Sequence, residues 1–221
     1  MGTNRLQIYN DALMLCGEKF LASLTESGEP RRLLDNVWSS NGVRYCLEQG
    51  QWQFAMRTQE IDNDPDITTE FGYTYAFDKP SDWVLTSALC SDERFTTPLT
   101  QYRDETDYWV ADITPIYVQY VSDDDQFGND LSRWPSTFCD YVAAYFASKI
   151  IFRLSADDKM RMALLQPGHG ILDRSKLIAK NRAAMTQGTR YPATGSWVHA
   201  RAGRRRGGPL GDGGVGGSLT G

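Results

Sequence analysis

The amino-acid sequence, 221 residues long, has no long apolar run. Its longest apolar stretch covers residues 141–147 and ends at Ser148 and Lys149, whereas a membrane-spanning helix needs about 20 apolar residues in a row. The N-terminal segment also lacks the apolar core of a secretory signal. We therefore expect no membrane contact, and we expect the chain to be made and to assemble in a cytoplasm.

Histidine and cysteine are scarce. The chain has two histidines, His169 and His199, and four cysteines, Cys16, Cys46, Cys90 and Cys139. The cysteines form no C-x-x-C pair, whereas metal clusters need close pairs and disulfide scaffolds need a denser count. We expect free, mostly buried thiols and no metal site. Because His169 lies between two glycines, it is interpreted as a loop residue rather than as a base.

Sequence motifs for catalysis are missing as well. There is no G-x-S-x-G nucleophile motif, no G-x-x-x-x-G-K-[ST] phosphate loop and no strand-borne G-x-G-x-x-G. Three acidic clusters are present, at residues 62–66, 104–107 and 123–125. Calcium-loop spacing fails at the first, where Ile67 occupies the glycine position, and at the last, where Trp134 occupies the final glutamate position. The clusters are therefore interpreted as solvated loops.

One enzymatic alternative stays open. Two carboxylates can catalyse hydrolysis when the fold brings them together, and such a pairing is not visible in a sequence. The candidates are Asp104, Glu105 and Asp107, in a hydrolase that degrades cell wall or nucleic acid. The favoured interpretation is a chain that is not an enzyme and has no catalytic residue, no metal and no cofactor.

Charge is unevenly distributed along the chain. Residues 188–221 contain five arginines and one aspartate, a net charge of +4, which leaves −9 for residues 1–187 out of a total of −5. Affinity for nucleic acid comes mostly from lysines and arginines that neutralise phosphates. An acidic body is therefore a poor binder of DNA, and we expect DNA to pass it without sequence-specific binding.

Apolar periodicity predicts an α+β fold: a helical bundle of about four helices, with a small inserted antiparallel β-sheet domain and an extended C-terminal tail. Helical spacing appears at residues 4–16, 30–49, 134–154, 156–165 and 171–185, with Ser155 as a cap and a break at residues 166–170. Period-two patterns appear at residues 54–61, 73–77, 83–90, 94–100, 108–113 and 115–122. The predicted domains are N-terminal helices (1–51), a β-rich domain (52–132), C-terminal helices (133–187) and the tail (188–221).

Both faces of the segment at residues 116–121 are apolar or aromatic. We expect one face of the sheet to pack on the helices and the other to meet a neighbouring subunit or a tail component. The candidate surface residues are Tyr73, Tyr75, Trp83, Tyr108, Trp109 and Tyr117.

The tail holds 11 of the 20 glycines and cannot bury enough apolar area to order itself alone. At about 3.3 Å per residue, it could extend roughly 110 Å. The basic run Arg204-Arg205-Arg206 could keep the tail solvated, touch DNA or dock in an acidic groove of a protein. We favour docking in an acidic groove. The candidate docking residues are Arg190, Tyr191, Pro192, Trp197, Arg201, Arg204, Arg205 and Arg206.

Several short segments resemble one protein family. They are ALMLCGE at 12–18, Ser23-Leu24, WQFA at 52–55, Gly72-Tyr73, YAF at 75–77, Pro80-x-Asp82-Trp83 and Arg133-Trp134-Pro135-x-x-Phe138. In this order they resemble the head-to-tail adaptor (connector) proteins of tailed bacteriophages, in the tail tubular protein A branch of the short-tailed phages. Arg190-Tyr191-Pro192 and Thr194-Gly195-Ser196 resemble the portal-docking tail of a related adaptor that stabilises packaged DNA.

The resemblance implies a structural virion protein at the head-tail junction, assembled in the host bacterial cytoplasm. It implies a homo-oligomeric ring of twelve copies that binds the portal protein after genome packaging. Such a ring extends the channel through which DNA is ejected and carries the tail nozzle or another tail component. Helices would pack side by side between subunits, the sheet would face the tail, and the C-terminal tail would grip the portal.

Overall fold

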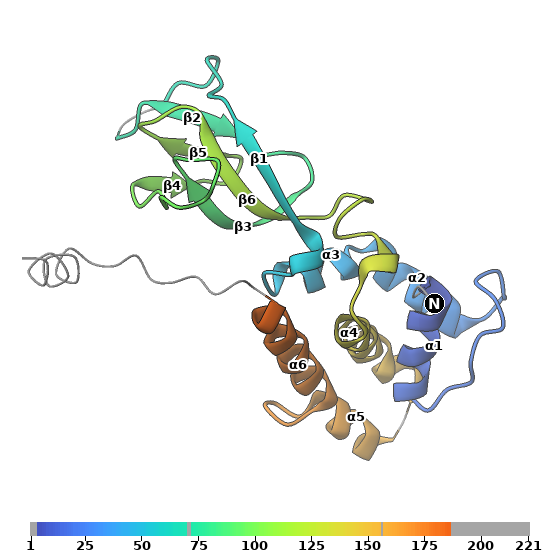
Figure 1. The fold of residues 1–221 in the computed structure, drawn as a ribbon. Helices are drawn as coiled ribbons and strands as arrows, with labels where there is room; N and C mark the ends of the chain where they lie inside the picture. The colour runs from blue at the N-terminus through green and yellow to red at the C-terminus, as the bar shows by residue number, and fades with distance from the viewer. Residues whose placement is uncertain (1–3, 70–71, 156, 187–221) are drawn as a thin grey trace, which may run out of the picture. The chain divides into compact units, whose positions relative to one another are not determined.

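The computed structural model describes residues 4–69, 72–155 and 157–186, and residues 1–187 group into one compact unit (Figure 1). The helices of the described part are α1 (Arg5–Leu15), α2 (Glu29–Ser39), α3 (Gly42–Glu48), α4 (Ser136–Leu154), α5 (Asp158–Leu165) and α6 (Ile171–Thr186). The strands are β1 (Met56–Ile61), β2 (Tyr75–Asp78), β3 (Trp83–Cys90), β4 (Tyr102–Asp104), β5 (Tyr108–Ala111) and β6 (Ile116–Ser122). The α+β class is confirmed, but the described part has six helices instead of about four.

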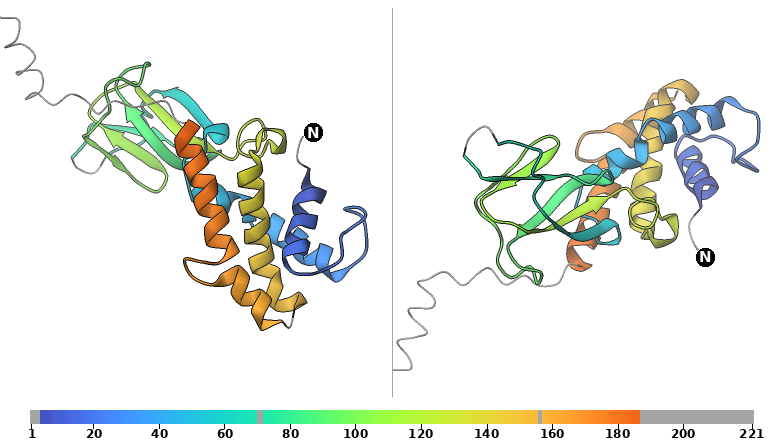
Figure 2. Two further views of the ribbon diagram at one scale, coloured as in Figure 1. Left: turned by 60° about the horizontal axis from the view of Figure 1, so that its bottom comes forward. Right: turned by 90° about the horizontal axis from the view of Figure 1, so that it is seen from above.

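Helix α4 lies between α1 and α6 and contacts both (Figures 1 and 2). Ten of its 19 residues are buried, which its large apolar side chains and small alanines predicted. At one close approach to α1, the Sγ of Cys16 lies 3.8 Å from the carbonyl oxygen of Ala147. All four cysteines are buried and form no disulfide, as predicted, and burial raises the pKa of Cys16 to about 11.

The single helix predicted at residues 30–49 is wrong, because the structure divides it into α2 and α3. Asn41 adopts a left-handed conformation with φ of 62° and redirects the chain. Gly42 follows it at a close approach of two backbones: a Cβ added there would lie 2.5 Å from the carbonyl oxygen of Val37. Close packing therefore makes Gly42 part of a turn and not an interior residue of one continuous helix.

The predicted start of α5 is also wrong. Ser155 follows the end of α4 in extended conformation, and α5 begins at Asp158. Its cap is Asp157, whose carboxylate accepts a hydrogen bond from the Lys159 amide at 2.9 Å, as aspartate at a helix N-terminus commonly does. The break at residues 166–170 is confirmed, and His169 lies in this loop as predicted.

The strands form two three-stranded antiparallel sheets instead of one, in the orders β1-β6-β3 and β2-β5-β4. The segment at residues 94–100, predicted as a strand, contributes one isolated bridge between Cys90 and Pro98. It forms a turn because the Asp92 carboxylate accepts hydrogen bonds from the backbone amides of Thr96 and Thr97. Strand β4, which pairs with β5, was not predicted.

Strand β6 contributes to two cores. Ile116, Val118 and Tyr120 pack among buried residues of both sheets, whereas Val121 belongs to the core of the helices. The sheet therefore does pack on the helices, as expected, but the face of β6 that carries Tyr120 meets the second sheet of the same chain. The side chain of Tyr117 stays half-exposed.

Polar contacts fix the sheets to the helices. Arg44 of α3 pairs with Asp123 and donates a second hydrogen bond to the Trp83 carbonyl oxygen at 2.7 Å. Within the β region, Asp82 pairs with Arg57 of β1 at 2.8 Å and accepts a hydrogen bond from the buried Ser122 hydroxyl of β6. Burial alone would raise the pKa of Asp82, but the bonds from Ser122 and Arg57 hold it below its usual value.

We expect Gly42→Ala to lower the free energy of unfolding by about 1–3 kcal/mol, because the added methyl group meets backbone that cannot move away. The control is Gly28→Ala, whose methyl group would meet only Pro30, at 3.7 Å. Urea unfolding of the two variants measures the difference. Equal stability of the two variants would show that the α2–α3 turn is not tightly packed.

We expect Asp82→Asn to destabilise the fold in a pH-dependent way. The pKa of Asp82 is lower in the folded chain than its unfolded value of about 3.9. The carboxylate therefore stabilises the fold above that value, and this contribution is lost as the pH falls through the folded pKa. Urea unfolding should show a gap between wild type and variant that is full at pH 6 and shrinks below about pH 4. A gap that stays constant from pH 6 to pH 3 contradicts the assignment.

Candidate functional site

The six aromatic residues predicted on a surface of the sheets do not form one exposed face. Trp109 is fully buried, so its predicted surface position is wrong. Tyr75 and Trp83 are partly buried and pack against the core between the sheets. Tyr73, Tyr108 and Tyr117 are partly exposed, and the Tyr117 hydroxyl donates to Glu60 at 3.3 Å.

A buried lysine, Lys79, lies against the rings of Trp83 and Trp109. The Nζ atom of Lys79 lies 3.9 Å from the ring centroid of Trp83 and 2.5 Å from a carboxylate oxygen of Asp104. Both indole N–H groups, from Trp83 and Trp109, donate to the Thr86 hydroxyl at 3.1 Å. That hydroxyl donates to Asp104 at 2.7 Å. The network satisfies these polar groups within the sheets and makes Asp104 a structural residue.

The other acidic loops are also used in local structure. A carboxylate oxygen of Asp64 accepts from the amide of Asp66 at 2.8 Å, and Asp124 accepts from the amide of Gln126 at the same distance. Asp123 pairs with Arg44. Across residues 4–69, 72–155 and 157–186, no three His, Cys, Asp or Glu side chains come close enough to hold a metal ion. These contacts are typical of turn-stabilising carboxylates.

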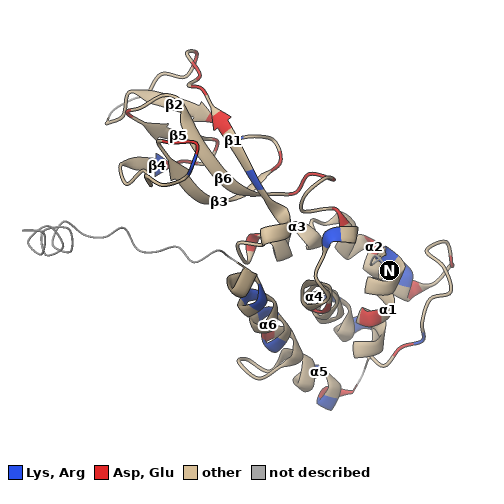
Figure 3. Cartoon of the chain, in the orientation of Figure 1, with Lys and Arg blue, Asp and Glu red and all other residues tan. Residues whose placement is uncertain are grey.

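Negative charge is concentrated in the sheets and their loops. Residues 52–132 carry 17 acidic and four basic side chains, a net charge of −13. Residues 133–187 carry nine basic and four acidic side chains, a net charge of +5. Figure 3 shows this contrast between the loops of the sheets and helix α6. The acidic body predicted from the sequence is therefore an acidic β region beside basic C-terminal helices.

The C-terminal helices also carry most of the exposed apolar side chains. Nine large apolar side chains are exposed in the described part, and six of them lie between the end of α4 and the end of α6. We call these six the C-terminal apolar surface: Phe152, Met162, Ile171, Leu177, Ile178 and Met185. Exposed fractions reach 68% at Met162 and 85% at Met185. Contiguous exposed apolar residues mark interaction sites, and the seven-residue spacing of Ile171, Ile178 and Met185 places these three on one face of α6.

Helix α6 is apolar on two sides. Leu172, Ala179 and Ala183 face the core of the helices. Ile171, Ile178 and Met185 follow each other at seven-residue steps on an exposed stripe. A surface helix normally has one apolar stripe, so the second indicates a further partner. The sequence carries this seven-residue signal, which our sequence analysis overlooked.

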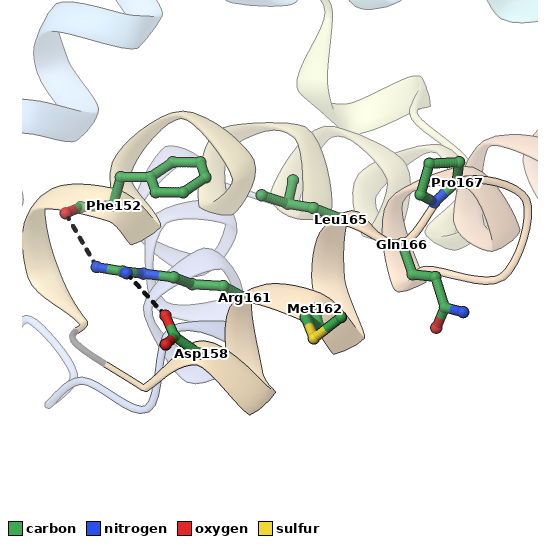
Figure 4. Close-up of a pocket in the computed structure, with 7 residues that line it drawn as sticks. All are labelled: Phe152, Asp158, Arg161, Met162, Leu165, Gln166 and Pro167. Carbon is green, nitrogen blue, oxygen red and sulfur yellow. Dashed lines mark hydrogen bonds and ion pairs between the residues drawn. The ribbon is translucent and has the colours of Figure 1, made fainter.

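An open hollow of about 490 Å³ lies between the end of α4 and α5 (Figure 4). Phe152, Met162, Leu165 and Pro167 supply most of its wall. Arg161 closes one side, where it pairs with Asp158 and donates to the carbonyl oxygens of Phe152 and Ser155. The Nε atom of Arg161 is buried and has no hydrogen-bond partner among the described residues, whereas the rest of the wall is mostly apolar and suits the apolar side chains of a partner protein. The hollow offers no nucleophile beside a base.

All eight predicted docking residues of the tail lie outside the described residues. No protein-family model matches the chain, and the search of curated proteins found no match. Within the part of the chain that the structure describes, no helix is long and apolar enough to span a bilayer.

We expect the double variant Leu177→Gln and Ile178→Gln to keep its fold but to self-associate less. Both side chains are about half exposed, so the free energy of unfolding should change by less than about 1 kcal/mol in total. Sedimentation velocity should show weaker association than for the control Lys180→Gln on the same helix. A large loss of stability would instead place these two side chains inside the fold of the single chain.

Proposed function

We propose that this chain is a structural subunit of a head-to-tail adaptor ring in a short-tailed bacteriophage. In this role it binds the portal, extends the DNA channel and gives the tail nozzle or another tail component its attachment platform. The observation that carries the proposal is the C-terminal apolar surface, because a large exposed apolar face is typical of a protein that works in an assembly. The resemblance of residues 12–18, 52–55 and 133–138 to adaptor proteins supplies the identity of that assembly.

The two kinds of secondary structure suit two different contacts. The C-terminal helices expose apolar side chains, as subunits of a permanent oligomer do before they assemble. The sheets expose mostly charged and polar loops, with Tyr73, Tyr108 and Tyr117 partly accessible among them. Aromatic side chains in a polar surround are typical of an interface between separately folded proteins. We therefore assign the helices to contacts between copies and the sheets to the tail component.

Charge supports a channel through which DNA slides. Each copy carries −13 in residues 52–132, and a ring multiplies that charge by its copy number, twelve in this proposal. A wall of this sign repels phosphates and offers few lysines or arginines to neutralise them. DNA would thus pass the β region during ejection without being retained.

The arginine-rich tail suits the grip on the portal. It carries +4 over residues 188–221 and has Tyr191 and Trp197 as its large aromatic anchors. Aromatic and arginine side chains commonly dominate binding energy at interfaces. Several such tails on one ring would act together, so the assembly would dissociate slowly even if each tail bound weakly.

The proposed role involves no catalysis. Among the acidic loop residues that could serve a hydrolase, Asp104 is held by Lys79 and Thr86. Glu105 lies 3.7 Å from Arg103. None of the observations favours a reacting carboxylate pair, so the adaptor is the one function that we put forward, at the head-tail junction of the virion.

We expect deletion of residues 189–221 to abolish stable binding to purified portal rings, because the deletion removes all eight docking residues. The matched control deletes residues 207–221 and keeps every one of them. Co-sedimentation of each variant with portals, followed by electron microscopy, measures the bound copies. Full binding by the longer deletion would contradict the assignment of the tail to the portal.

A further inference from the structure

The exposed stripe of α6 combines apolar and basic side chains. Arg174 lies between Ile171 and Ile178 along the stripe, and Arg182 lies between Ile178 and Met185. In the described part of the chain, neither arginine side chain makes an ion pair or a hydrogen bond, although both are exposed. A partner for this stripe should therefore offer apolar surface together with negative charge.

An acidic edge with the matching properties lies on the other side of α4. Asp11 on α1 and Asp140 on α4 are close enough for the charge of Asp140 to raise the pKa of Asp11. Partial burial raises the pKa of both carboxyl groups. Neither has a cation as partner among the described residues. Met14, one turn after Asp11, is 58% exposed and supplies apolar surface.

The acidic edge is defined by Asp11, Met14 and Asp140, and neither of its carboxylates has a cationic partner among the described residues. Two neighbouring carboxylates that lose part of their hydration repel each other unless a cation compensates them. A guanidinium group would remove that cost and would leave its own alkyl stem over Met14. The acidic edge therefore lacks a cation, which the arginines of the α6 stripe can provide.

A symmetric contact between two copies of α6 does not satisfy the same charges. The exposed ionic side chains of α6 are Arg174, Lys180 and Arg182 on the basic side and Asp173 on the acidic side. Asp173 already accepts a hydrogen bond from the Gly168 amide at 2.7 Å. An isologous α6–α6 contact would bring arginines of like charge together, which is unfavourable.

We infer that the α6 stripe of one copy packs against the acidic edge of the next copy, with Arg174 and Arg182 as the cations that face Asp11 and Asp140. The inference rests on the proposed function, because it names the two faces through which the adaptor ring forms. The two faces are different surfaces of the chain, so the contact is heterologous and repeats from copy to copy. A contact of this kind closes into a ring or continues as a filament.

Charge reversal on each face tests the inference. One variant carries Asp11→Lys and Asp140→Lys, and the other carries Arg174→Glu and Arg182→Glu. Each alone should self-associate at least about tenfold more weakly than wild type, measured by sedimentation equilibrium. A chain that carries all four substitutions should regain association, because the charges are exchanged and not removed.

Mixing the two variants gives the sharper result. Each variant keeps one face of the wild-type contact intact and carries reversed charge on the other face. In a 1:1 mixture, Arg174 and Arg182 of one variant can therefore meet Asp11 and Asp140 of the other. We expect the mixture to form alternating assemblies of 1:1 stoichiometry that grow beyond a dimer, because the reversed faces of the two variants also attract each other, and we expect monomers in each separate sample. A symmetric interface would not give this pattern.

Matched controls separate a change of contact from a change of net charge. Asp125→Lys and Lys159→Glu alter exposed residues outside both faces, and both should associate as wild type does. Circular dichroism verifies folding, and the milder Asp11→Asn with Asp140→Asn replaces the lysine variant if that one unfolds. Asparagine keeps the shape and removes the charge, so weaker association is expected there too.

The outcomes distinguish this inference from the proposed function. If wild type forms rings on portals and each of the two double variants alone forms them equally well, the inference is wrong and the adaptor function stands. If the mixture of the two variants contains only monomers although wild type assembles, the inference is also wrong. If wild type neither self-associates nor binds portals, both are overturned.

Discussion

Burial of α4 is the constraint on which the rest of the described structure depends. Ten of its residues are buried, and α1, α2, α3, α5 and α6 all contact it. Small residues allow this crowding: Ala143, Ala144 and Ala147 are buried on α4, and Ala179 and Ala183 are the contact residues of α6. Leu172 is the large side chain that α6 packs against the core, whereas Ile171, Leu177, Ile178 and Met185 remain exposed. The packing that completes the fold of one chain therefore leaves a second apolar face of α6 exposed.

The separation of charge follows the same division between helices and sheets. The sheets hold themselves together through a core of apolar residues and through the Lys79 network, so their loops are free to carry a net charge of −13 across residues 52–132. The C-terminal helices carry +5 and expose apolar side chains. An adaptor ring would use both properties, because its copies must adhere to one another while the DNA that passes them must not adhere to the channel.

Much of the fold could be predicted from local pattern, and the failures have physical causes. Helices α1, α4 and α6 and strands β3 and β6 follow apolar periods over enough residues to be clear. The α2–α3 turn was missed because Asn41 and Gly42 respond to a close approach to Val37, which is a contact of the folded chain. Strands β2 and β5 were predicted, but the second sheet was missed because β4 has only three residues and because the pairing of strands is a contact of the folded chain. At the candidate site, the seven-residue step of Ile171, Ile178 and Met185 was readable, whereas the burial of Trp109 depends on pairing between strands.

We propose that this chain works as one of many identical subunits that meet through their C-terminal helices. Electron microscopy of the full-length chain bound to isolated portals tests this proposal most directly. We expect a closed ring in which α6 is covered by a neighbouring copy and the sheets point away from the portal. A single bound copy, or a ring in which the C-terminal apolar surface faces solvent, would contradict it.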